Sequence, residues 1–205
     1  MSAAFTRTLI SATEQLLLSG PGRGFNRIRR ALQKDLARAG DIQIMVGYFL
    51  PTGRLRRALQ RVGRRGGRLQ LLLAGKSDVL LSKLAGQSLY RRFLKAGAEI
   101  YEYEPQILHA KLLIMDDAVY VGSANLDPRS LGINYEFLIR FENRKMAAEA
   151  REIFDDALHH CRRIDPAEWR RGRTFWARLR RRWAYFVLAR IDPYLARKQW
   201  RALPD

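Results

Sequence analysis

The residues best suited to chemistry lie in two short segments, His109-Ala110-Lys111 and Gly122-Ser123-Ala124-Asn125. His109 and Lys111 are two residues apart in a predicted strand, so both side chains should leave one face of it. Ser123 and Asn125, also two apart, follow the next predicted strand. An imidazole, an ammonium, a hydroxyl and an amide that converge would neutralise a phosphate and offer it several donors. Near neutral pH a histidine can attack phosphorus or protonate a leaving oxygen.

The elements that must position these residues alternate between strands and helices. Apolar runs predict strands at 41–50, 68–74, 98–103, 108–115, 118–121 and 135–141. Helical spacing of apolar residues predicts helices that contain Ile28, Leu32 and Leu36, then Leu55 to Val62, and then the ranges 87–96 and 145–162. This alternation favours an α/β sandwich of layers α-β-α around a mostly buried mixed sheet.

Composition narrows the class of partner. The chain has 205 residues, 38 Lys and Arg against 20 Asp and Glu, and a formal net charge of +18. Most of these cations are arginine, which suits bidentate contact with phosphate, so nucleic acid or an anionic membrane surface is the expected partner. No His, Cys or Asp cluster has the spacing of metal ligands, so neither a metal nor another cofactor is expected.

The segment from His109 to Asn125 resembles the HxKxxxxD and GSxN signature of the phospholipase D superfamily. The wider sequence, with YEYEPQILHAKLLIMDD and GSANLDPRSLGINYEF, resembles the second catalytic half of bacterial cardiolipin synthases over residues 25–163. This resemblance implies a phospholipase-D-like fold. It also implies metal-independent transfer or hydrolysis of a phosphodiester in an anionic, phosphatidylglycerol-like phospholipid, through a phosphohistidine intermediate.

The resemblance also implies roles for individual residues. His109 would act as nucleophile or as acid, and Lys111, Ser123 and Asn125 would hold the phosphate oxygens. Glu136 would orient the histidine through its other ring nitrogen. Asp116 completes the catalytic set, as an orienting residue more than a proton carrier, although its spacing to Gly122 is one residue shorter than the family's usual pattern.

A second departure from the family is more serious, because its site joins two such motifs and this sequence has one. The other histidines, His159 and His160, have no lysine two residues on and are not expected to be catalytic. Three alternatives follow: a homodimer that pairs two copies of His109, a pairing with a separate first-half chain, or an inactive half-enzyme that binds membranes. A nuclease of the phospholipase D type is the competing activity, with nucleic acid as its partner.

The expected organisation has three parts. Residues 1–24 are predicted to form an N-terminal helix and a glycine-rich linker, residues 25–163 the single catalytic half-domain, and residues 164–205 a basic amphipathic helical tail. The tail interleaves aromatic residues with arginines, a pattern typical of membrane interfaces and also of a helical subdomain that packs inward. The expected location is cytoplasmic, peripheral on the inner face of the cell membrane.

Overall fold

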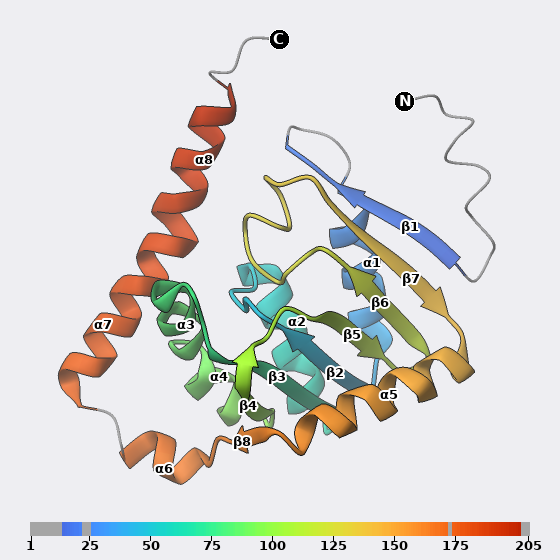
Figure 1. Ribbon diagram of the computed structural model, residues 1–205, viewed down its shortest axis with the longest axis horizontal. Helices are drawn as coiled ribbons and strands as arrows, with labels where there is room; N and C mark the ends of the chain where they lie inside the picture. Colours follow the sequence, from blue (N-terminus) through green and yellow to red (C-terminus); the bar gives the residue numbers. More distant parts are fainter. Residues whose placement is uncertain (1–13, 22–25, 172–173, 202–205) are drawn as a thin grey trace.

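The fold is an α/β sandwich built on one mixed sheet, as the sequence predicts (Figure 1). The computed structural model describes residues 14–21, 26–171 and 174–201, with side chains up to residue 196. Within these residues the sheet has eight strands in the order β1-β7-β6-β5-β2-β3-β4-β8. The strands are β1 (Glu14–Ser19), β2 (Asp41–Val46), β3 (Arg68–Lys76), β4 (Glu99–Ile107), β5 (Lys111–Met115), β6 (Ala118–Gly122), β7 (Glu136–Glu142) and β8 (Cys161–Arg163).

The strands β2, β3 and β4 are parallel, and every other neighbouring pair is antiparallel. Central strands are apolar on both faces, since β2 and β5 are buried along most of their lengths. A strand buried on both faces needs a covering layer on each side. The two hydrophobic clusters of the protein supply these layers.

One face of the sheet is covered by α1 (Arg27–Arg38), α2 (Gly53–Arg64), α3 (Leu80–Gln87) and α4 (Tyr90–Lys95). The other face is covered by α5 (Arg144–Leu158), which buries Ala147, Ala150 and Phe154. Figure 1 shows α5 in front of the sheet and α1 and α2 behind it. Side chains of Asn26 and Asn143 accept backbone N–H groups at the starts of α1 and α5, which fixes where these helices begin.

The tail is a helical layer and not an extended arm. It consists of α6 (Pro166–Arg171), α7 (Phe175–Phe186), a π-helical segment η1 (Val187–Ile191) and α8 (Asp192–Arg201). In Figure 1, α7, η1 and α8 form a long red helical rod beside α3. The rod is attached at Ala184, which is fully buried, and at Tyr185, whose hydroxyl accepts from Arg56 Nη1 at 2.9 Å. No helix in the described ranges is long and apolar enough to cross a membrane.

The inward and outward faces of the tail differ in how far their aromatic side chains are buried. Trp169 packs inward, with its ring centroid 5.0 Å from that of Tyr90. The guanidinium of Arg181 lies over the Trp169 ring, 4.5 Å from its centroid. Trp176 and Trp183, in contrast, are 74% and 61% exposed on the outer face of α7. The side chain of Trp200 lies outside the described residues.

Several predicted boundaries are wrong. Residues 14–19 of the predicted N-terminal helix form the edge strand β1, which pairs with β7, and residues 1–13 lie outside the described residues. The strand expected at 108–115 begins only at Lys111. The helix expected at 87–96 is found as the shorter α4, while the preceding α3 is not predicted. The helix expected to reach 162 ends at Leu158, because residues 161–163 pair with β4. Apart from α3, each error concerns an edge or an end, where tertiary pairing overrides local pattern.

Candidate active site

The candidate site lies at the sheet edge where β2 and β6 end and β5 and β7 begin. Lys111 is the first residue of β5 and pairs with Val46, the last residue of β2. Ser123 follows β6, and its backbone N–H donates to Phe137 O at 3.0 Å. Because the strands are neighbours in the sheet, residues far apart in sequence meet at this edge.

Two glycines permit this close approach of backbones. A Cβ on Gly122 would lie 2.4 Å from Phe137 O, and one on Gly47 would lie 2.5 Å from Leu108 O. Neither contact is tolerated by a real Cβ, so only glycine lets β6 approach β7 and the end of β2 approach the His109 segment. The glycine of the GSxN motif is thus a packing requirement of the site.

Lys111 and His109 are neighbours, although His109 precedes β5 and is exposed instead of lying in the strand. The Lys111 ammonium donates to His109 O at 2.7 Å. Burial lowers the pKa of Lys111, and the negative charge of Glu136 opposes this effect. A partly desolvated ammonium beside an exposed imidazole suits an incoming anion.

Glu136 is held by two neighbours of the motif. The Ser123 hydroxyl donates to one carboxylate oxygen of Glu136, and Asn134 Nδ2 donates to the other at 3.3 Å. The Phe137 N–H in turn donates to Ser123 Oγ at 3.1 Å. In the described residues no hydrogen bond joins Glu136 to His109, so its predicted orienting role finds no contact within one chain.

Asn125 ties the motif to the end of β2. Its Oδ1 accepts from the backbone N–H of Tyr48 at 3.2 Å. Among the described residues its Nδ2 has no hydrogen-bond acceptor, which leaves this donor available to a ligand.

Asp116 stands apart from the other predicted site residues. It lies in the hairpin turn after β5, in the left-handed region with φ of 51°, and its carboxylate accepts from the N–H groups of Gly40 and Asp41. The length of β5 separates it from Lys111 by about 16 Å. The structure thus gives Asp116 an orienting contact away from Lys111, since its carboxylate joins the β5–β6 turn to the start of β2.

Sequence reasoning missed the pair of Tyr48 and Asp78, which lies beside His109. The Tyr48 hydroxyl donates to Asp78 at 2.6 Å. This bond and burial raise the pKa of Tyr48 to about 12. The same bond lowers the pKa of Asp78, and the charge of nearby His109 lowers it further. Both residues follow parallel strands at their carboxyl ends, which is the sequence signal that could have found them.

A cavity of about 370 Å³ opens next to these groups. Apolar and polar side chains both line it, and Leu188 and Asp192 of the tail complete it. Its lining comprises Tyr48, Phe49, Leu50, Val79, Ser82, Asn125, Asp127, Pro128, Arg129, Ser130, Asn134, Glu136, Leu188 and Asp192. Burial chiefly raises the pKa of Asp127, while its bonds from the Ser130 and Arg129 N–H groups oppose this.

The tail is fixed to this cavity by an ion pair. Arg129 Nε and Nη2 each donate to a carboxylate oxygen of Asp192 at 2.7 Å. Asp192 begins α8, so the bidentate pair sets the position of the rod relative to the loop that follows the GSxN motif. Spacing alone could not reveal a contact between residues so distant in sequence.

The other two histidines, for which no catalytic role is expected, lie away from the site. His159 and His160 are exposed at the end of α5. Within the part of the chain that the structure describes, no three His, Cys, Asp or Glu side chains gather closely enough to hold a metal ion.

Comparisons with known proteins converge on one family. The family model described as "Cardiolipin synthase, PLD-like domain" matches residues 32–158. Cardiolipin synthase A of Cronobacter sakazakii is 33% identical over 176 residues, which are 85% of this chain and 36% of that protein. Cardiolipin synthase 1 of Bacillus anthracis is 34% identical over 152 residues, 73% of this chain and 30% of that protein. The chain thus spans about a third of the length of these relatives.

Solved structures share the fold at lower identity. The phospholipase D family member Nuc from Salmonella typhimurium has a TM-score of 0.62 and 19% identity, covering 74% of this chain and 98% of Nuc. Phosphatidylserine synthase from Haemophilus influenzae has a TM-score of 0.67 and 13% identity, covering 90% of this chain and 47% of that one. The fold predicted from sequence is confirmed.

Proposed function

The chain belongs to the family of cardiolipin synthase, PLD-like domains, and we propose that it transfers or hydrolyses the phosphodiester of an anionic phospholipid. The observation that carries this proposal is the arrangement of Lys111, Ser123 and Asn125 beside His109 at one sheet edge, next to a half-apolar cavity. Cationic and neutral donors would bind the phosphate, and the apolar wall would accept the lipid.

In the proposed reaction a histidine ring nitrogen attacks phosphorus, and the bond from phosphorus to the leaving alcohol oxygen breaks. A second histidine gives its proton to that oxygen. The same second histidine then removes a proton from water or an acceptor alcohol, whose oxygen attacks the phosphohistidine and frees the first ring. Lys111 would balance the charge that builds on the phosphate oxygens in both steps.

We propose that the second histidine comes from another copy of the motif, because the other two histidines of this sequence, His159 and His160, lie at the end of α5. The exposure of His109 supports such pairing. Apolar side chains beside the site support it too: Tyr135 is 82% exposed, and Leu18 and Phe137 are exposed opposite each other on β1 and β7. We therefore propose a homodimer, or a pair with a separate first-half chain, that brings two motifs together.

The lipid is proposed to be phosphatidylglycerol-like, met at the inner face of the cell membrane. The exposed aromatic and arginine residues of α7 support this peripheral contact, since such rings settle at headgroup depth while arginines bind lipid phosphates. The protein would then present its cavity, whose wall includes Leu188 of the same rod, beside the lipid surface.

The decisive test uses phosphatidylglycerol vesicles, EDTA in the buffer, and product analysis by mass spectrometry. Wild type should release glycerol or form cardiolipin, and H109A should lose at least about a thousandfold in rate, as expected for loss of a nucleophile or acid. H159A serves as the matched control and should retain activity. Unchanged turnover in H109A would exclude the proposed site. Absence of turnover in wild type, with or without a first-half chain, would favour the inactive membrane-binding alternative.

Nuclease activity is the second candidate, favoured by the net charge of +18. Plasmid nicking in EDTA tests it directly. Nicking that depends on His109, without lipid turnover, would replace the lipid assignment.

A further inference from the structure

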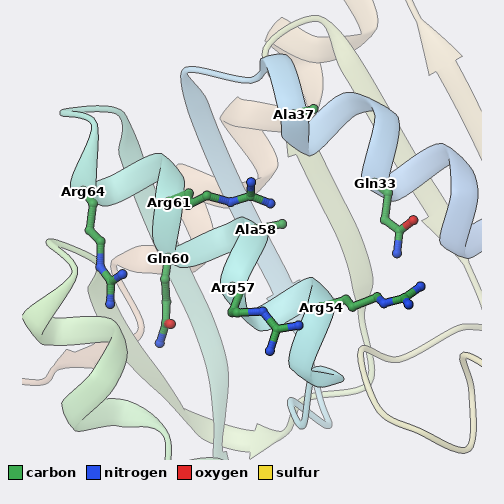
Figure 2. A pocket seen from close by; sticks show the side chains of 8 residues that line it. All are labelled: Gln33, Ala37, Arg54, Arg57, Ala58, Gln60, Arg61 and Arg64. Atoms are coloured by element: carbon green, nitrogen blue, oxygen red, sulfur yellow. The ribbon is translucent and has the colours of Figure 1, made fainter.

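A second cationic surface lies away from the candidate active site, in a groove between α1 and α2. The groove has a volume of about 520 Å³. Figure 2 shows its lining, which consists of Gln33 and Ala37 from α1 and Arg54, Arg57, Ala58, Gln60, Arg61 and Arg64 from α2.

The four arginines of the groove form one row. Their spacing of three and four residues places them along one side of α2, over about 15 Å of helix. All four are exposed, none of their side chains makes a hydrogen bond or ion pair among the described residues, and α2 contains no acidic residue. Four unpaired guanidinium groups so close together repel one another, so an anionic partner would bind there with little competition from the protein.

The row of arginines is continuous with the tail. Arg57 also lines the adjacent groove, whose other wall includes Tyr185, Arg190 and Tyr194. Neighbouring Arg56 donates to Tyr185. The α2 arginines therefore border the tail at Tyr185 and at Tyr194, which is 66% exposed.

From this continuity we infer that the α2 arginines bind the same anionic bilayer as the tail, and so fix how the protein lies on it. The inference deepens the proposed function, on which it rests. One contact, the aromatic face of α7, would insert into the interface, and the second would pair with lipid phosphates. Two separate contacts on a rigid body allow fewer orientations than one, which would hold the active-site cavity in a constant position relative to the lipid.

A test compares two double variants that each remove two charges. R57Q/R61Q changes the groove, and R144Q/K145Q changes α5 on the opposite face of the sheet. Glutamine is a good helix former, and both pairs are exposed, so circular dichroism and melting should be unchanged. Co-sedimentation with phosphatidylglycerol/phosphatidylcholine vesicles should show about a tenfold weaker partition for R57Q/R61Q and less than twofold for the control. The difference should shrink at high salt, because exposed charges are screened.

A fluorescent label tests the orientation. An environment-sensitive dye at R64C, in a C161S background, should report a less polar setting when vesicles are added, while the same dye at K145C should not. Equal responses at both positions, or equal vesicle binding of both double variants, would overturn the inference.

Nucleic acid is the competing partner for a row of arginines. If R57Q/R61Q weakens binding of a 20-base-pair duplex but leaves vesicle binding unchanged, the groove is a nucleic-acid site and the inference is wrong. These measurements need no turnover. If the wild type turns over lipid and R57Q/R61Q binds vesicles as well as the wild type does, the inference alone is rejected. If the wild type shows no turnover but R57Q/R61Q still loses vesicle binding, the proposed function alone is rejected.

Discussion

At the scale of single residues, the electrostatic pair of Lys111 and Glu136 is the most informative feature. Burial lowers the pKa of the lysine, and the carboxylate raises it again. In the proposed function phosphate binding needs the charged ammonium, so activity should be present below the pKa of Lys111 and be lost as pH rises through it.

The change E136Q removes the charge that favours the protonated lysine. The pKa of Lys111 should fall further, so the basic limb of the profile of kcat/KM against pH should move to lower pH. We also expect kcat/KM at neutral pH to fall about tenfold, because the hydrogen bond that Ser123 donates to residue 136 loses its charged acceptor and becomes weaker. E149Q, on α5, is the control. A basic limb that stays in place would show that Lys111 is not the titrating group.

At the scale of elements, the side chain of Asp116 links the β5–β6 turn to the segment that leads into β2. Its carboxylate accepts from Gly40 and Asp41 N–H groups, and its own N–H donates to Asp41 O at 2.9 Å. The β5–β6 turn is thereby tied to the start of β2, the strand whose far end contributes Tyr48 to the site.

D116A should therefore destabilise the protein without a direct effect on chemistry. The loss of acceptors for two N–H groups and the left-handed backbone of residue 116 should together cost about 1–2 kcal/mol of unfolding free energy. D116N should lose less unfolding free energy, because asparagine tolerates this backbone conformation and keeps one acceptor oxygen. Urea denaturation measures the cost, and kcat measured at low temperature should stay within about twofold of wild type. A thousandfold lower kcat in a folded D116A would return Asp116 to the catalytic group.

At the scale of the whole molecule, the proposed reaction needs a second copy of the motif. Exposed apolar side chains of β1, β7 and the preceding loop lie next to Glu136. Burial of two such side chains in an interface is worth about 3 kcal/mol or more.

Y135S/F137S should accordingly raise the dissociation constant of a homodimer by about a hundredfold, and lower turnover in parallel at dilute concentrations. I153S, which removes an exposed apolar side chain from α5, should do neither. Light scattering over a concentration series gives the result. A wild-type protein that stays monomeric and inactive would direct attention to a separate first-half chain.

The rod of α7, η1 and α8 makes a further prediction at this scale. W176S/W183S removes two exposed rings and should weaken binding to phosphatidylglycerol vesicles by about tenfold, with little change in melting temperature. M146S/I153S is the matched control on α5. Equal binding by both variants would mean that the aromatic face of α7 does not contact the bilayer.

The sequence by itself determined the sandwich fold, the family and which motif is the candidate site, because these depend on local patterns: alternating apolar runs, and donors spaced two residues apart on adjoining strands. Helix ends and edge strands were predicted less well. Glu14–Ser19 became a strand only because β7 offers it an unpaired edge, and Cys161–Arg163 because β4 does.

Only the tertiary structure decided which distant residues meet. It separated Asp116 from Lys111, because a strand's length stands between them, and it brought Tyr48, Asp78 and Asp192 to the candidate site. It also showed that the arginines of α2 border the tail. Such contacts depend on strand order and on the packing of helices against the sheet, which a linear pattern of residues does not specify.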